Sequence, residues 1–159
     1  MKSKIHYNSH MRILIQECLK ASVVVDRKEI SAINKGEVIF VGFTQGDSEE
    51  IIDKMLAKRR KLRIFSDERG KTNLTLDQTK GDILCVSQFT LYANLKKGNR
   101  PSFEQARKGE EAKQLYDLFC EKIEKVANVK FGIFGADRKV HLINDGPFTI
   151  FRDSKELVK

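Results

Sequence analysis

The sequence predicts a mixed α/β protein of the α+β class that is richer in strands than in helices. Short runs of β-branched and aromatic residues recur along the chain, and roughly eight of them have strand character. Only two long stretches carry the apolar spacing of an amphipathic helix. Because helices and strands do not alternate regularly, the pattern argues against a doubly wound parallel sheet. The chain has 159 residues, enough to bury one core without disulfides or metals, so we expect a single domain.

The predicted strands are short and are separated by turn residues. The run at 38–43 is almost continuously apolar, which is typical of a strand buried on both faces. The run at 83–92 turns polar halfway, which places the end of its strand near Ser87. Asp145-Gly146-Pro147 is expected to form an ordinary turn between the last two strands. In chain order the predicted strands cover residues 12–18, 21–25, 29–33, 38–43, 83–92, 129–134, 139–143 and 148–152.

Two helices are predicted from capping and periodicity. The first begins after Gly46-Asp47-Ser48, where a capping side chain precedes Glu49 and Glu50 at the positive end of the helix dipole. Its apolar residues recur at i, i+3 and i+4 as far as Leu62. The second runs over about 110–127. We expect the first helix to pack one face on the sheet and to expose a basic face.

The positive charge is concentrated in two places. The chain has a net charge of +8 and a pI of about 9.4. A basic surface attracts polyanions by counterion release, so these residues are candidate contacts for a nucleic acid; a solvated helix face is the alternative. The candidates are Lys58, Arg59, Arg60 and Lys61 in the first helix, and Lys96, Lys97 and Arg100 in a loop.

The chain has the character of a reduced cytoplasmic protein. No apolar run approaches the ~20 residues that span a bilayer, and residues 1–10 lack the apolar core of a secretory signal. We expect residues 1–10 to be a flexible extension of a domain at 11–159. Cys18, Cys85 and Cys120 lie far apart in apolar segments, which predicts buried thiols rather than disulfides.

The sequence contains no conventional catalytic set. His6 and His10 are a weak pair for a metal, so no metal site or cofactor is expected. His141 alternates with apolar neighbours in a predicted strand, where a structural role is favoured over a general base. Ser87 and Thr90 are candidate nucleophiles, but the sequence supplies neither a partner base nor an orienting acid.

Six short segments carry a more specific signal. They are Met11 to Gln16, Leu62 to Phe65, Ser87 to Tyr92, Lys97 to Phe103, Gly132 to Asp137, and Asn144 to Thr149. Together, in order and at compatible spacing from Met11 to about Ser154, they resemble the D-aminoacyl-tRNA deacylase family. The resemblance implies a homodimer with a partly closed, β-barrel-like sheet and two long helices. Such enzymes need no cofactor and hydrolyse the ester between a D-amino acid and the 3′-terminal ribose of tRNA.

The resemblance also implies where the site lies and how it works. It makes Ser87, Gln88, Phe89 and Thr90 the catalytic segment and the two basic clusters tRNA contacts. An aminoacyl ester is already activated and the neighbouring 2′-OH can assist water, so backbone N–H groups rather than a triad would stabilise the oxyanion. The substrate-binding segment reaches the site from the opposite subunit and has a cis Gly-Pro bond; its residues are Asn144, Gly146, Pro147 and Thr149.

Two positions depart from the family pattern. Members usually have arginine where this chain has Glu17, and methionine where it has Arg138. If both side chains face the Gly-Pro turn, they could form a compensating ion pair that supports it; two unrelated surface changes are the alternative. A related animal deacylase that removes L-alanine from the tRNA for threonine resembles this chain at both places. Three hypotheses follow: D-specific hydrolysis, favoured by Ser87 to Thr90; relaxed or L-directed editing; and nucleic-acid binding without catalysis.

Overall fold

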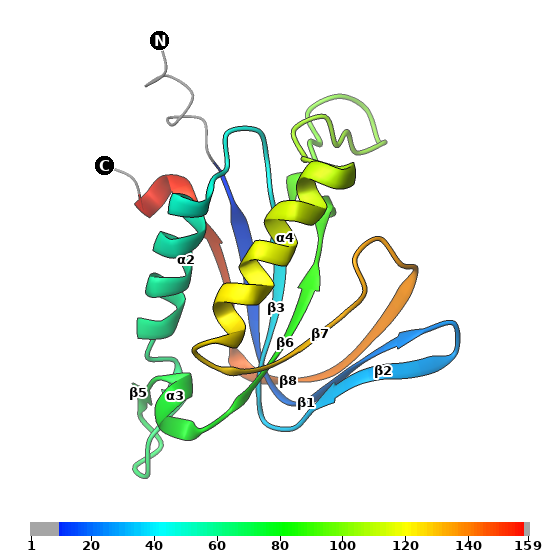
Figure 1. Cartoon of the computed structure of the whole chain (residues 1–159). Helices are drawn as coiled ribbons and strands as arrows, with labels where there is room; N and C mark the ends of the chain where they lie inside the picture. Colours follow the sequence, from blue (N-terminus) through cyan, green and yellow to red (C-terminus); the bar gives the residue numbers. More distant parts are fainter. Residues whose placement is uncertain (1–9, 158–159) are drawn as a thin grey trace.

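The computed structural model describes residues 10–157 and contains a strongly curved sheet covered by helices (Figure 1). The main sheet has six strands in the order β2-β1-β3-β6-β7, with β8 on the other edge of β1, while β4 and β5 form a separate pair. This arrangement confirms the predicted strand-rich α+β class with a partly closed, barrel-like sheet. The elements are β1 (Arg12–Val25), β2 (Lys28–Ile33), β3 (Gly36–Gly42), α2 (Glu49–Lys61), β4 (Phe65–Ser66), β5 (Thr72–Leu74), α3 (Leu76–Thr79), β6 (Asp82–Ser87), the 3-10 helix η1 (Phe89–Tyr92), α4 (Gly109–Glu124), β7 (Asn128–Phe131), β8 (Arg138–Asp153) and the 3-10 helix η2 (Ser154–Leu157).

β1 organises the sheet because it pairs with three other strands. One edge of β1 runs antiparallel to β8 from Arg12 to Val25. On the other edge, its first half pairs with β3 and its second half with β2. The sequence predicted two strands here, at 12–18 and 21–25, from two separate β-branched runs. The structure instead carries one strand through these exposed residues, with a shift of register against β8.

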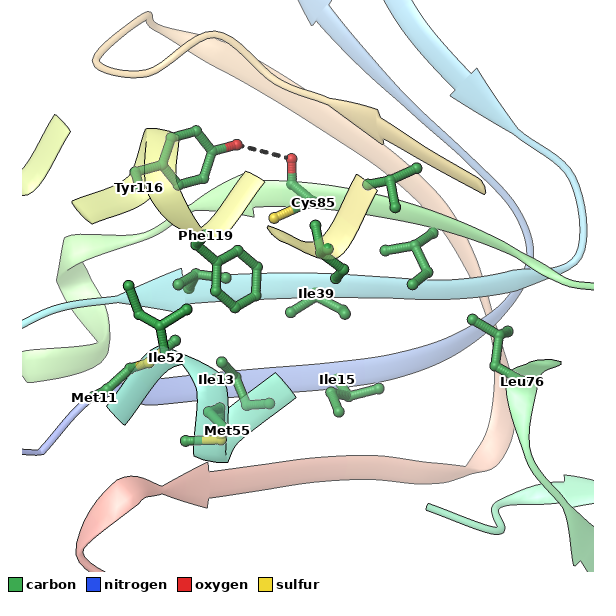
Figure 2. Packing of buried hydrophobic residues seen from close by; sticks show 14 of the residues in the cluster. Met11, Ile13, Ile15, Ile39, Ile52, Met55, Leu76, Cys85, Tyr116 and Phe119 are labelled. Carbon is green, nitrogen blue, oxygen red and sulfur yellow. Dashed lines mark hydrogen bonds between the residues drawn. The ribbon is translucent and has the colours of Figure 1, made fainter. Parts of the chain in front are cut away.

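The main core lies between the sheet and the two long helices, as the apolar helix faces predicted. Figure 2 shows side chains from the sheet and from both helices meeting in this layer. Tyr116 of α4 donates a hydrogen bond of 3.2 Å to the carbonyl oxygen of Cys85, which ties α4 to β6. The fully buried members include Ile13, Ile15 and Ile39 of the sheet, Ile52 and Met55 of α2, and Phe119 of α4.

The last two predicted strands are one strand, β8, so the predicted hairpin turn at Gly146-Pro147 is wrong. Both flanks of this dipeptide pair with β1 in the same direction, with Asn144 opposite Cys18 and Thr149 opposite Gln16. The residues 144–149 of β8 therefore lie opposite only 16–18 of β1, and the surplus backbone bulges outward. The Gly146-Pro147 bond is cis, as the resemblance implied.

A buried ion pair fixes the C-terminal end of α2 to the start of β3. Arg59 Nη1 donates to Glu37 Oε1 over 2.9 Å, and the two side chains are 1% and 4% exposed. Burial raises the pKa of the Glu37 carboxyl above its usual value of 4.5, and the charge of Arg59 opposes that shift. Because its guanidinium is buried in this pair, Arg59 cannot reach a phosphate, and its assignment as a tRNA contact is wrong.

The remaining helix predictions are confirmed with differences at the ends. Ser48 is the N-cap of α2, but its side chain makes no capping hydrogen bond. α4 covers 109–124 rather than 110–127. The four-residue helix α3 was not predicted, although Thr75 and Gln78 form a reciprocal capping box at its start.

The described part of the chain contains no disulfide. Cys18 and Cys85 are buried, Cys120 is partly buried, and all three are free, as predicted. The proposed extension at 1–10 falls outside the described residues except for His10. Within residues 10–157, no helix is both long and apolar enough to cross a membrane.

Candidate active site

The ends of β3 and β6 meet at one edge of the sheet. These strands are parallel neighbours, and Val41 lies opposite Ser87 near the end of each. The backbone N–H of Gln88 donates to the carbonyl oxygen of Val41 over 2.7 Å, which fixes the segment after β6 to β3. The carboxyl ends of neighbouring parallel strands are a frequent position for ligand sites. The polar segment after β6 is therefore held where a ligand can reach it.

A pocket of about 430 Å³ opens at this edge. Its walls come from the ends of β3 and β6, the N-terminal end of α4 and residues 134–138. Ser87, Gln88 and Phe89 line it, so three of the four predicted catalytic residues meet in one place. Thr90 is exposed and lies outside the lining; its hydroxyl oxygen accepts a hydrogen bond from the side-chain amide of Gln88.

Arg138 enters the pocket from the start of β8. Its Nη2 donates to Gln88 Oε1 over 2.9 Å and also to the carbonyl oxygen of Ser87. Burial lowers the pKa of the Arg138 guanidinium from its usual value, but arginine remains charged at neutral pH. The side chain therefore places a positive charge in the pocket and fixes the Gln88 amide, which in turn contacts Thr90.

The pocket offers no side-chain base to a hydroxyl nucleophile. Among the described residues that line it, the one carboxylate is Asp137, whose side chain is 96% exposed. His141 lies on β8 in a different and larger hollow, of about 850 Å³, between β1, β2 and β8. None of the predicted site residues lines that hollow, so its size does not make it the better candidate site. Residues 10–157 also contain no group of three or more potential metal ligands.

The Gly146-Pro147 bulge lies outside the pocket of its own chain. Both residues are exposed, and a Cβ added at Gly146 would meet no atom within 4 Å. The ends of the bulge are held by β1: Asn144 Nδ2 donates to the carbonyl oxygen of Glu17 over 3.0 Å, and Gln16 Nε2 donates to Thr149 Oγ1 over 3.1 Å. The predicted substrate-binding residues thus form an anchored projection into open space.

Glu17 and Arg138 do not pair within one chain. Arg138 lies opposite Val25, eight residues along β1 from Glu17, which corresponds to about 26 Å of strand. Glu17 is buried beside the bulge, and burial raises the pKa of its carboxyl; Asp145 adds to this shift while Lys35 opposes it. Joint support of one Gly-Pro bulge by Glu17 and Arg138 therefore requires two subunits and stays a prediction.

The two basic clusters lie at opposite ends of the sheet. The end of α2 contacts the start of β3 through Arg59, and Arg60 pairs with Asp77 of α3 over 2.8 Å. The exposed loop that carries Lys96, Lys97 and Arg100 instead lies beside the N-terminal end of α4, at the pocket end of the molecule (Figure 1). The loop cluster is therefore much better placed to contact a polyanion that enters the pocket.

Sequence reasoning gave no role to two basic residues of the pocket wall, Arg107 and Lys108. They directly precede α4, and Arg107 is paired with Glu111 over 2.9 Å. A basic dipeptide before a helix is common on protein surfaces, so no local pattern marks these residues. Only the packing of α4 against β6 brings them to the predicted catalytic segment.

Comparisons with known proteins agree with one another. The family model for D-Tyr-tRNA(Tyr) deacylase matches residues 14–153. The D-aminoacyl-tRNA deacylases of Aquifex aeolicus (strain VF5) and Sulfurihydrogenibium sp. (strain YO3AOP1) are 51% and 49% identical to this chain; each alignment covers 92% of this chain and 100% of the relative.

Two solved structures are similar to this chain over most of its length. One titled "c-Myc DNA Unwinding Element Binding Protein" is 38% identical, with a TM-score of 0.84 over 89% of this chain and 97% of its own. A probable eukaryotic D-amino acid tRNA deacylase is 20% identical, with a TM-score of 0.77 over 91% and 99% of the two chains, and shares the fold. Because the family model spans most of the chain and the relatives are about half identical over their full length, this chain belongs to the D-Tyr-tRNA(Tyr) deacylase family.

Proposed function

We propose that this protein hydrolyses the ester bond of D-aminoacyl-tRNA and releases free D-amino acid and tRNA, which makes it a cytoplasmic proofreading hydrolase of translation. The observation that carries the proposal is the pocket at the end of β6, where Ser87, Gln88 and Phe89 meet in a chain half identical to D-aminoacyl-tRNA deacylases. The overall charge of +8 suits a tRNA substrate.

The proposed chemistry uses backbone groups and the substrate itself. The pocket lining contains one highly exposed carboxylate and no histidine among the described residues, which favours a reaction that needs no side-chain base. Phe89, which lines the pocket, begins η1, and N–H groups at the start of a helix have no acceptor within it. They can therefore donate to the oxyanion that forms when water attacks the ester, assisted by the 2′-OH of the terminal ribose.

The site is proposed to be completed by a second copy of the chain. Gly146 and Pro147 project away from their own pocket, while Asn144 and Thr149 hold the base of the projection. In a homodimer the projection would enter the partner's pocket, where the Gly-Pro carbonyls can accept hydrogen bonds from the substrate ammonium. Gripping the group that all amino acids share, and leaving no room on the L side, would select chirality without selecting the side chain.

Hydrolysis assays test the proposed function directly. The enzyme is expected to release D-tyrosine from D-Tyr-tRNA and to leave L-Tyr-tRNA intact. Faster turnover of L-Ala-tRNA(Thr) would instead favour L-directed editing, the candidate that Glu17 and Arg138 support by their likeness to the animal relative. If none of the three esters is hydrolysed but tRNA still binds, the result would support the third hypothesis, a nucleic-acid-binding protein without catalysis.

Replacing Thr90 by alanine is expected to lower kcat by less than about tenfold, because its hydroxyl lies outside the pocket and, among the described residues, contacts the Gln88 amide. Loss of a true nucleophile would cost at least about 10⁴ in kcat. Single-turnover hydrolysis of D-Tyr-tRNA measures the difference. A fall of the larger size in a folded variant would restore a hydroxyl nucleophile and contradict the backbone mechanism.

The two basic clusters are expected to differ in their effect on tRNA binding. Neutralising Lys96, Lys97 and Arg100 together with glutamine should reduce the slope of log affinity against log salt by about 2 to 3, since each lost phosphate contact contributes about 0.7 to 0.9. The control variant Lys58→Gln/Lys61→Gln removes two exposed charges at the other end of the sheet and should reduce the slope by less than about 0.7, the contribution of one contact. A reduction of about 1.4 to 1.8, the contribution of two contacts, would instead place the tRNA along α2. Contacts of Lys58, Arg60 and Lys61 with tRNA stay a prediction until this measurement.

A further inference from the structure

An exposed aromatic pair lies at the rim of the pocket. Phe89 lines the pocket, yet the residue is 47% exposed and leaves apolar surface in water. The ring of Phe103 packs against it in an edge-on arrangement, with centroids 5.2 Å apart and planes at 79°. Lys108 places its Nζ 5.2 Å from the Phe89 centroid and 5.7 Å from the Phe103 centroid. The proposed chemistry uses the backbone of Phe89, so neither ring nor the ammonium has a role in it.

The combination of these groups points to a nucleotide. Aromatic rings exposed beside a cation form stacking sites for unpaired bases, because every base has a π-face and its phosphate is attracted by the cation. Arg107 is already paired with Glu111, whereas the interactions of Lys108 among the described residues are with these two rings. Its long side chain can therefore turn to a phosphate without breaking an ion pair.

We propose that Phe89, Phe103 and Lys108 form an aromatic platform that stacks the unpaired base preceding the terminal adenosine of tRNA and neutralises its phosphate. This inference rests on the proposed function, because the pocket itself is taken to hold the aminoacylated nucleotide. The next nucleotide must then cross the pocket rim, where the platform lies.

The chain continues from the platform toward the basic loop. A bridge between Asn94 and Ser102 closes the base of this loop, with backbone hydrogen bonds of 2.8 and 3.0 Å. Phe103 follows directly, so the loop that carries Lys96, Lys97 and Arg100 starts where the platform ends. A single strand leaving the pocket over Phe89 would meet further positive charge, which gives the RNA a continuous path.

The test compares two esters of D-tyrosine. One is D-Tyr-tRNA, and the other is D-tyrosyl-adenosine, in which the amino acid is esterified to a single nucleoside. Phe103→Leu is expected to lower kcat/KM for D-Tyr-tRNA about tenfold more than for D-tyrosyl-adenosine, mainly through KM, because only the tRNA has a base to stack. Phe103→Tyr keeps an aromatic ring and should retain a ratio within about threefold of wild type.

Two further variants separate the platform from general damage. Lys108→Gln should reduce the salt slope for D-Tyr-tRNA by about 0.7, the contribution of one single-strand phosphate contact. Phe151→Leu is the matched control: Phe151 is 50% exposed and the Arg12 guanidinium lies 5.7 Å from its ring centroid, but Phe151 lies on β8 away from the rim. Phe151→Leu should change kcat/KM by the same factor for D-Tyr-tRNA and for D-tyrosyl-adenosine.

Several outcomes would overturn the platform. Equal losses on both esters in Phe103→Leu would make the rings part of the pocket scaffold. Dissociation of the dimer by this variant, measured by light scattering at the assay concentration, would assign the rings to the subunit interface. If the wild type hydrolyses neither ester, the proposed function fails by itself. Affinity for uncharged tRNA then tests the platform separately, and wild-type affinity in both Phe103→Leu and Lys108→Gln would refute it.

Discussion

Gly146→Ala is expected to lower kcat/KM for D-Tyr-tRNA at least about 100-fold while leaving the fold intact. Within its own chain, a Cβ at this position meets no atom within 4 Å, and its φ is not among the positive values, so alanine fits without strain. In the proposed dimer the same Cβ would enter the partner's pocket beside the substrate ammonium. Misplacing a bound group by about 1 Å costs roughly 10² in rate, so activity should fall although stability does not.

Mixing subunits would show whether the bulge acts across the dimer. Gly146→Ala chains have an intact pocket, whereas Ala136→Trp chains have a filled pocket and an intact bulge. If the bulge serves the partner, random exchange should restore about a quarter of wild-type activity, because half of the dimers are mixed and each has one complete site. No recovery, with mixed dimers demonstrated, would contradict a shared site. Gly132→Ala is a control glycine change, since its Cβ would meet only ordinary contacts at 3.9 Å or more and activity should stay near wild type.

Arg59→Met is expected to lower the free energy of unfolding by about 3 to 5 kcal/mol at pH 7, because it leaves the buried Glu37 carboxylate without its cation. Urea denaturation followed by circular dichroism measures the change. Arg60→Met is the matched control on the same helix turn: Arg60 also pairs with a carboxylate, over 2.8 Å, but its side chain is 53% exposed. An exposed pair of this kind contributes at most about 1 kcal/mol.

The double variant and the pH dependence separate an unpaired charge from lost packing. Arg59 Nε and Nη2 are buried without a hydrogen-bond partner among the described atoms, so Arg59→Met/Glu37→Leu should recover most of the lost stability. In Arg59→Met, the pKa of Glu37 should rise further, since burial then acts unopposed. A raised carboxyl pKa penalises folding above the unfolded value and not below it, so the defect should shrink as pH falls toward 4.5. A loss independent of pH, unchanged in the double variant, would assign the cost to packing.

Local sequence patterns predicted some elements of this fold correctly and others wrongly. The buried run of β3 and the two amphipathic helices were predictable because burial sets a period along the chain itself. The hairpin at Gly146-Pro147 was wrong because turn residues report a local bend, whereas only pairing of both flanks with β1 decides that the strand continues. Arg59 was misassigned for a related reason. The sequence of a basic cluster at the end of a helix does not distinguish a guanidinium that faces water from one that pairs with a carboxylate on β3.

The sequence by itself determined the α+β class and the candidate site motif after β6, because these depend on residue types in short stretches. The tertiary structure alone decided what those residues meet. Parallel pairing of β3 and β6 and the packing of α4 against them bring Gln88, Arg138 and Lys108 to one pocket from segments about 20 to 50 residues apart in the chain. The same fold turns Gly146-Pro147 outward, since β1 holds both ends of the bulge and offers no partner to its middle.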